Sequence, residues 1–310
     1  MTQDALAGWV DLTADAVSRA RSACAELRWH EAYRRRWREV RAEAGLRAAH
    51  ASAALEGARL PLEHVRALAT GGAAWPATTS GAAPGDGAQR AAGRGVRLDV
   101  GPDVPPGPVP GAEAVLVGAL RGASLVDGLL PDLGARGAGA LPPLPQLLAR
   151  AHTVVAAGWL PTDALGRLRA DGPALDQRGL GTAPVGREVA ARVDLLSRTV
   201  ATTSAPALVV AALVHAEVLA VRPFVAGNGL VARLVARVLA TTGGLDPTGS
   251  VLPEPAWAAA PQLYTAAVAG YATGERDRVA AWFSAYADAV VAGADRARAV
   301  ADGVLAGRLG

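Results

Sequence analysis

The hydrophobic residues recur mainly at intervals of three and four positions, which is the period of an amphipathic helix. Four large residues at this spacing predict one or two long helices over residues 11–50: Trp29, Tyr33, Trp37 and Val40. The same period returns beyond position 111 and predicts helices over 112–128, 142–158, 185–201, 205–220, 228–242, 256–273 and 275–305. No alternating apolar and polar run is long enough for a sheet, so we expect an all-α fold.

A change in composition divides the chain into three parts. Residues 71–111 are dominated by Ala, Gly, Pro, Thr and Ser, a composition that supports neither helix nor strand. We interpret this segment as a linker between an N-terminal helical region, residues 1–70, and a core domain, residues 112–310. Within the N-terminal region a helix is expected over about 48–59, ending near Gly57.

Within the core, one segment breaks the helical pattern. Residues 167–186 are punctuated by Gly and Pro and lie between two predicted helices. The pattern predicts a short β-hairpin or an irregular flap at this position.

The amino-acid composition excludes several kinds of catalytic and metal site. The 310 residues include no lysine, which excludes a P-loop lysine, a pyridoxal Schiff base and a kinase-type strand lysine. The single cysteine, Cys24, permits neither an internal disulfide nor a cysteine-cluster zinc site. The N-terminus lacks the features of a signal peptide, and the most apolar stretch, residues 205–221, is too short to span a membrane. We therefore expect a soluble, cytoplasmic protein without a membrane partner.

The charge pattern does not favour nucleic acid as a partner. The formal net charge of +3 is small for this length. The arginines are scattered, and aromatic residues interleave with them only at Trp29, Tyr33 and Trp37.

One helix–turn–helix segment carries the most specific chemical signal. An apolar helix stops where Pro223 and Gly227 make its continuation unfavourable, and a second helix begins at about Gly229. Glycines at 227 and 229 let backbone N–H groups converge where the second helix presents its free amides and positive dipole end. Asn228 adds a side-chain amide, and Arg233 lies one turn into the helix. This geometry suits a phosphate, whereas the alternative is an ordinary turn with Asn228 as N-cap.

The same segment resembles the signature of the Fic family, His-Pro-Phe-x-Asp/Glu-Gly-Asn-Gly-Arg-x-x-Arg. Six positions fit it in register: Pro223, Phe224, Gly227, Asn228, Gly229 and Arg233. Other features agree in order over roughly residues 140–290, namely Ala211-Ala212, His215, Leu148 to His152 with Gly166 to Arg169, and Trp282-Phe283. The resemblance implies a Fic (Fido) helical bundle with a small β-hairpin flap. It also implies a nucleotide or phosphate site that includes Gly227, Asn228, Gly229 and Arg233.

A second resemblance lies in the N-terminal region. Residues 52–57, Ser-Ala-Ala-Leu-Glu-Gly, are similar to the inhibitory motif Ser/Thr-x-x-x-Glu-Gly/Asn of Fic proteins whose inhibitory helix precedes the core. In those proteins the glutamate pairs with the second arginine of the Fic motif and keeps the nucleotide γ-phosphate out of its productive position. The resemblance therefore assigns Ser52, Glu56 and Gly57 as inhibitory residues, with Arg233 as the partner of Glu56. The alternative for Glu56 alone is a glutamate on a solvated helix face.

Three departures from the Fic signature fall on groups with chemical roles. Arg222 occupies the position of the family histidine, and a guanidinium cannot accept the proton of a target hydroxyl. Ala226 occupies the position of the acidic Mg²⁺ ligand and has no oxygen to offer, and Leu230 replaces the first motif arginine. We expect His215 to be a packed, hydrogen-bonded histidine, so no catalytic residue and no metal ligand is assigned. Arg222 becomes a candidate phosphate-binding residue instead.

These features predict a Fic-fold protein with a degenerate active site. It would bind ATP, another nucleotide or a phosphorylated small molecule at the turn of residues 227–229, with AMP transfer impaired or lost. The enzymatic alternative is an active protein adenylyltransferase, or a related nucleotidyl or phosphoryl transferase, that uses an unrecognised base. The third hypothesis is a non-catalytic scaffold that docks a protein target on the Arg-rich helix of residues 20–50 or on the flap, residues 167–186. The resemblance implies strand addition for docking on the flap. The sequence leaves these three open.

Overall fold

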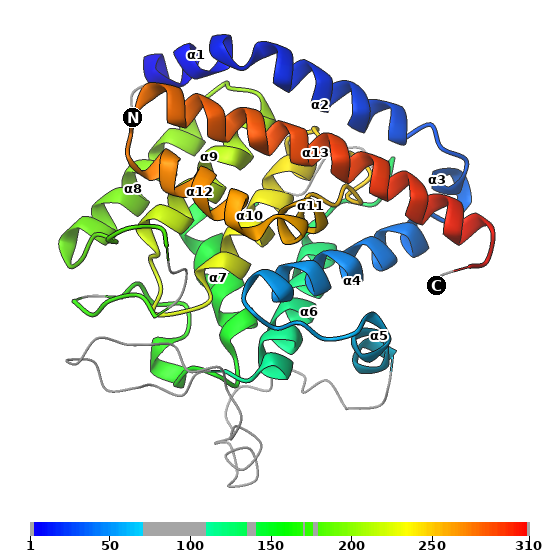
Figure 1. Ribbon diagram of the computed structural model, residues 1–310, viewed down its shortest axis with the longest axis horizontal. Helices are drawn as coiled ribbons and strands as arrows, with labels where there is room; N and C mark the ends of the chain where they lie inside the picture. The colour runs from blue at the N-terminus through cyan, green and yellow to red at the C-terminus, as the bar shows by residue number, and fades with distance from the viewer. Residues whose placement is uncertain (1–2, 71–109, 135–140, 170, 176–178, 309–310) are drawn as a thin grey trace, which may run out of the picture.

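The computed structural model describes residues 3–70, 110–134, 141–169, 171–175 and 179–308. These residues form α-helices and one 3-10 turn and contain no β-sheet, so the all-α prediction is confirmed (Figure 1). The helices are α1 (Gln3–Leu12), α2 (Ala14–Leu27), α3 (Ala32–Arg35), α4 (Trp37–Leu55), α5 (Leu62–Thr70), α6 (Ala112–Leu129), α7 (Leu144–Ala156), α8 (Arg187–Thr202), α9 (Ala207–Val221), α10 (Asn228–Thr242), α11 (Glu254–Ala259), α12 (Pro261–Ala272) and α13 (Arg276–Leu305), with the 3-10 turn η1 at Thr162–Ala164.

Helix α9 is the centre of the bundle. Twelve of its fifteen residues are buried, and a helix that is apolar on every side belongs in the core of a large domain. Helix α10 packs along it, and α12 and α13 cover it from another side. The indole of Trp282 on α13 donates a hydrogen bond to the Ala212 carbonyl of α9 (2.9 Å). The two helices that flank the predicted phosphate turn therefore pack against each other within the core of the bundle.

The N-terminal helices pack on this core. Helix α2 runs along α13, and α4 contacts α6, α10, α11 and α13 (Figure 1). The helix expected over about 48–59 is the C-terminal part of the longer helix α4. That helix ends before Gly57, whose φ of +90° turns the chain away. The fold thus places the predicted inhibitory residues against α10.

Close packing between α6 and α7 positions α7 beside the turn. A Cβ atom added at Gly118 of α6 would lie 2.2 Å from the Val155 carbonyl oxygen of α7, so only glycine permits this approach. Val155 in turn lies near Gly227, where an added Cβ atom would be 3.7 Å from a methyl group of Val155. Helix α7 therefore forms one wall of the turn.

Some expectations change or fall outside the described residues. The single helix expected over 256–273 is two helices, α11 and α12, because Pro261 cannot continue the helix and Ala260 leaves helical geometry (φ −137°, ψ 63°). The described part of the flap, 167–186, has no hairpin strands, and residues 170 and 176–178 of it are not described. Most of the expected linker, residues 71–109, also lies outside the described residues. Among the described helices, none is long and apolar enough to cross a membrane.

Candidate functional site

The predicted phosphate turn joins α9 to α10. Helix α9 ends at Val221. The next residue, Arg222, caps it in the left-handed conformation (φ 46°, ψ 64°), and Gly227 has φ +83°. Helix α10 begins at Asn228, and its first intrahelical bond runs from the Val231 N–H to the Gly227 carbonyl (3.1 Å). The amides of residues 228–230 therefore have no acceptor within their own helix, and they carry the positive end of its dipole. A helix terminus of this kind is suited to an anion.

The side chain of Asn228 holds the turn together. Its Oδ1 accepts the Phe224 N–H and its Nδ2 donates to the Phe224 carbonyl, both at 2.9 Å, and the residue is fully buried. This pairing closes the loop between the two helices. In the structure the side chain of Asn228 thus stabilises the conformation of the turn. Its contact with a ligand stays a prediction.

His152 of α7 fastens the turn from the other side. Its Nδ1 accepts the Gly166 N–H (2.9 Å), so its Nε2 carries the proton and donates to the Ala226 carbonyl (3.1 Å). Its ring stacks on Phe224 with centroids 4.0 Å apart. Burial lowers the pKa of His152 to about 4, against a smaller upward effect of the Ala226 hydrogen bond, so the ring is neutral at pH 7. The sequence placed His152 only within the region of resemblance, without this role.

Arg222, predicted as a phosphate ligand, reaches the flap. Its side chain is buried, and Nη2 donates to the Gly181 carbonyl (2.7 Å). The residue at the position of the family histidine therefore links the turn to the segment that covers it. A contact between Arg222 and a bound anion remains untested.

A second arginine, Arg169, holds the flap more extensively. Its guanidinium donates to the carbonyls of Arg222 (2.6 Å), Gly172 (2.9 Å) and Val221 (2.9 Å), and also to that of Pro184. The residue is 5% exposed. One buried cation thus connects the end of α9 to two points of the flap, a role that the sequence did not indicate.

The flap backbone also pairs with the turn. The Arg169 N–H donates to the Pro223 carbonyl (2.8 Å), and the Leu175 N–H donates to the Val225 carbonyl (2.7 Å). Part of the flap backbone is therefore already hydrogen-bonded to the loop that it covers.

The structure brings two of the three predicted inhibitory residues, Ser52 and Glu56, into contact with Arg233. Arg233 Nη2 forms an ion pair with Glu56 (2.5 Å), Nε donates to Ser52 Oγ (2.6 Å), and Nη1 donates to Tyr264 Oη (3.4 Å). The side chains of Arg233 and Glu56 are 1% and 10% exposed. Burial lowers the pKa of Arg233, but Glu56 and Tyr264 raise it by more, so the guanidinium stays charged. The Glu56 carboxylate is thus the charge partner of a fully buried cation.

His215 lies in an aromatic box rather than at the turn. Its Nε2 forms a hydrogen bond with Tyr264 Oη (2.6 Å), and its ring lies edge-on to Trp257, Trp282 and Tyr286. Burial, and secondarily the charge of Arg233, lower the pKa of His215 well below its ordinary value. The packed, hydrogen-bonded state expected for His215 is therefore what the structure shows.

Two of the three positions that depart from the Fic signature are apolar. Ala226 and Leu230 are both buried, and neither side chain carries a polar atom. Glu217, the nearest acidic residue on α9, pairs with Arg192 (2.8 Å) and accepts the Tyr271 hydroxyl (2.8 Å). Within the described ranges, no three His, Cys, Asp or Glu residues are grouped as a metal site would require.

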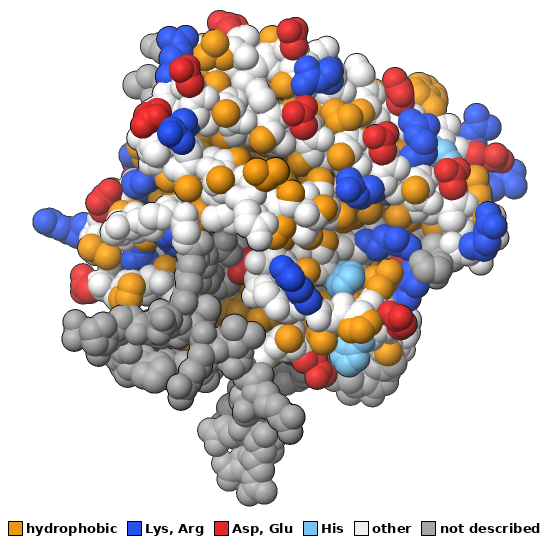
Figure 2. Space-filling model, viewed as in Figure 1, with side chains coloured by type: hydrophobic (Ala, Val, Ile, Leu, Met, Phe, Trp, Pro, Cys, Tyr) orange, Lys and Arg blue, Asp and Glu red, His pale blue; other side chains and the backbone are white. Residues whose placement is uncertain are grey.

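The surface does not present a basic face on the side that Figure 2 shows. Arginine and acidic side chains are interspersed there. Exposed ion pairs elsewhere in the described residues include Arg19 with Asp288 (3.1 Å) and Arg278 with Glu275 (2.8 Å). Interspersed charges of both signs do not create the field that attracts nucleic acid.

The comparisons with known proteins address the fold. No protein-family model matches the chain, and a search of curated proteins finds no match. Among solved structures, the chain is similar to a Fic family protein from Desulfovibrio desulfuricans G20, with a TM-score of 0.65 and 17% sequence identity over 91% of this chain and 74% of that one. The chain therefore has the fold of a Fic family protein, as the motif resemblance implied. At 17% sequence identity the similarity shows the fold and does not show the activity.

Proposed function

We propose that the protein binds a nucleotide or another phosphorylated ligand at the turn of residues 227–229. In this proposal Glu56 restrains the site by pairing with Arg233, and AMP transfer is impaired or lost. The observation that carries the proposal is the buried pair itself. Arg233 lies one turn beyond the start of α10, and its charge is matched by the carboxylate of Glu56 at the end of α4.

A phosphate and the Glu56 carboxylate are chemically equivalent partners for Arg233. Both are anions that accept charge-assisted hydrogen bonds from a guanidinium. A ligand phosphate against the amides of residues 228–230 lies close to the same side chain, because Arg233 is on the first turns of α10. Glu56 on Arg233 therefore competes with full engagement of the phosphate.

The side chains around the turn argue against catalysis of AMP transfer. A guanidinium at position 222 has no acceptor for the proton of an attacking hydroxyl. The methyl group of Ala226 offers no oxygen to Mg²⁺, so the charge neutralisation that phosphoryl-type transfer requires has no protein ligand here. His215 and Glu217 are held in other contacts. We therefore favour binding over an active adenylyltransferase.

The scaffold hypothesis is less favoured. Strand addition requires unpaired backbone groups on the flap. The described flap backbone donates to Pro223 and Val225 at two points, and Arg169 and Arg222 fasten it further. A target peptide would have to displace these contacts.

Titration calorimetry with ATP, ADP and pyrophosphate tests the proposal on the wild-type protein, Glu56→Gly and the double variant Glu56→Gly/Arg233→Met. Removing the restraint is expected to tighten binding by about fivefold or more, and removing Arg233 as well is expected to reverse this gain. The exposed Glu39, on the same helix α4, supplies the control variant Glu39→Gln, which should bind as the wild type does. Absence of binding by both wild type and Glu56→Gly would favour the scaffold.

The enzymatic alternative needs a separate assay. Wild type and Glu56→Gly are incubated with α-labelled ATP, Mg²⁺ and a mixture of candidate protein targets. Our proposal predicts no covalent label on any protein. Label that depends on Glu56→Gly would establish a transferase and overturn the degenerate-site interpretation.

A further inference from the structure

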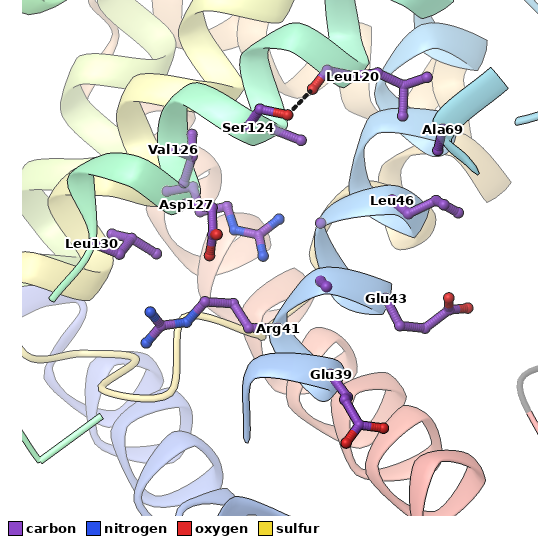
Figure 3. Close-up of a pocket in the computed structure, with 14 residues that line it drawn as sticks. Glu39, Arg41, Glu43, Leu46, Ala69, Leu120, Ser124, Val126, Asp127 and Leu130 are labelled. Carbon is purple, nitrogen blue, oxygen red and sulfur yellow. Dashed lines mark hydrogen bonds between the residues drawn. The ribbon is translucent and has the colours of Figure 1, made fainter. Parts of the chain in front are cut away.

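A groove of about 740 Å³ lies apart from the glycine turn, between α4, α5 and α6. Its lining residues come from α4 on one side and α6 on the other, with the Glu39 and Glu43 side chains pointing away from α6 (Figure 3), and Arg237 of α10 completes the lining. A volume of this size is within the range of small-molecule sites, roughly 300–1,000 Å³. The groove is thus large enough for an organic ligand.

Arg41 lies at one side of this groove and is 4% exposed. Its Nε donates to the Thr248 carbonyl (3.0 Å) and its Nη1 donates to the Pro131 carbonyl (2.9 Å). Its Nη2 is buried and has no hydrogen-bond partner. Buried polar groups are nearly always paired, so an unpaired guanidinium N–H indicates a missing acceptor.

Arg237, which lines the same groove, also has a buried N–H group without a hydrogen-bond acceptor. Its Nη2 donates to the Gly249 carbonyl (2.7 Å), whereas its buried Nε has no partner. Burial is the main cause that lowers the pKa of Arg41. Asp127 and Asp246 raise it, and the charge of Arg237 lowers it further, so the two cations are close enough to interact. An anion that accepts from both would pair the two N–H groups and offset this repulsion.

The acidic residues of the groove leave room for such an anion. Glu43 is paired with Arg47 (2.7 Å) and Arg66 (2.6 Å), and Glu39 is paired with Arg36. Asp127 is the remaining carboxylate. It is exposed and lies beside Arg41 in Figure 3. Asp127 therefore competes with an added anion without supplying the acceptors that Arg41 and Arg237 lack.

Apolar side chains form the rest of the walls. Leu46 of α4, Leu120 and Val126 of α6, and Leu130 beyond α6 line the groove. We propose that this groove binds a small organic acid, with its carboxylate between Arg41 and Arg237 and its apolar body against these leucine and valine side chains. The site is separate from the turn of residues 227–229 and does not depend on the function proposed there.

Binding of 4-phenylbutyrate and octanoate, measured by titration calorimetry, tests this proposal. Saturable binding is expected for both acids and not for octanamide, which has the same chain and no charge. Arg41→Met or Arg237→Met should weaken binding about tenfold or more, because each removes a charge-assisted hydrogen bond. Asp127→Asn should strengthen it, since the competing carboxylate is lost.

Two further variants keep the test decisive if the arginine variants unfold. Ala42 is exposed and lines the groove, so Ala42→Trp should fill it and abolish binding without disturbing the core. Arg38→Gln removes an exposed pair with Asp132 and a cation–π contact with Trp37, none of which lines the groove, so this variant should bind as the wild type does. No saturable binding of either acid, equal binding of octanamide, or unchanged binding by Ala42→Trp would each overturn the proposal.

Discussion

Replacing Glu56 by glutamine removes one negative charge and almost no volume. In the folded protein this charge faces the Arg233 guanidinium at 2.5 Å, and the two side chains are 10% and 1% exposed. After the substitution Arg233 keeps Ser52 and Tyr264 as neutral acceptors. The buried cation would then lack its nearest counter-charge while its other hydrogen bonds persist.

The size of the effect follows from this burial. Removing one partner of a buried ion pair costs roughly 3–5 kcal/mol, because the other charge stays desolvated. The Ser52 and Tyr264 hydrogen bonds and the residual exposure of Glu56 reduce this cost, so we expect a loss of roughly 2–4 kcal/mol in the free energy of unfolding. For a chain of this length the loss corresponds to a decrease in Tm of roughly 4–8 °C.

Thermal and urea unfolding of wild type, Glu56→Gln and the surface control Glu39→Gln measure this loss. The control should stay within about 0.5 kcal/mol of wild type, because exposed ion pairs contribute little. Pyrophosphate should raise the Tm of Glu56→Gln more than that of wild type, since the added anion replaces the lost carboxylate. Equal stability of Glu56→Gln and wild type, or equal pyrophosphate shifts, would refute this reasoning.

Three further outcomes follow from the contacts around the turn. Arg169→Met should lower the free energy of unfolding by roughly 3 kcal/mol or more, because four backbone carbonyls lose a charged donor. The variant should also be cleaved faster by protease within the flap, and an unchanged cleavage rate would contradict this prediction. His152 has a pKa of about 4 when folded and an ordinary pKa of 6.5 when unfolded, so its contribution to stability, on the order of 3 kcal/mol, is present above pH 6.5 and declines as the pH falls toward 4. Unfolding of His152→Gln should therefore depend less on pH over this window, and an identical slope in both proteins would contradict the assignment. Arg222→His should not support AMP transfer, because Ala226 still offers no metal ligand, and label from α-labelled ATP on that variant would contradict this expectation.

The turn could be predicted from the sequence because its causes are local. Pro223 and Gly227 stop one helix, and the left-handed conformation at Gly227 starts the next. The buried position of α9 could also be predicted from the sequence, because a helix without a polar face has to lie in the core. The alignment of Glu56 with Arg233 came from the resemblance of both motifs, and the structure places the two side chains in contact.

The directions of the other arginines could not be predicted. Arg169, Arg222 and Arg41 bond to backbone carbonyls that are distant in sequence, such as Gly181 for Arg222 and Thr248 for Arg41. Any exposed or buried carbonyl within reach of a long guanidinium is a potential acceptor, so the choice depends on the packed fold. The same holds for His152, whose role depends on how α7 meets the turn.

The most direct test of the central claim is a crystal structure of Glu56→Gly grown with ATP. We predict density for the phosphates against the amides of residues 228–230, with the guanidinium of Arg233 bonded to a phosphate oxygen. ATP bound elsewhere on the protein, or an empty turn at saturating ATP, would contradict the claim that this turn is a restrained phosphate site.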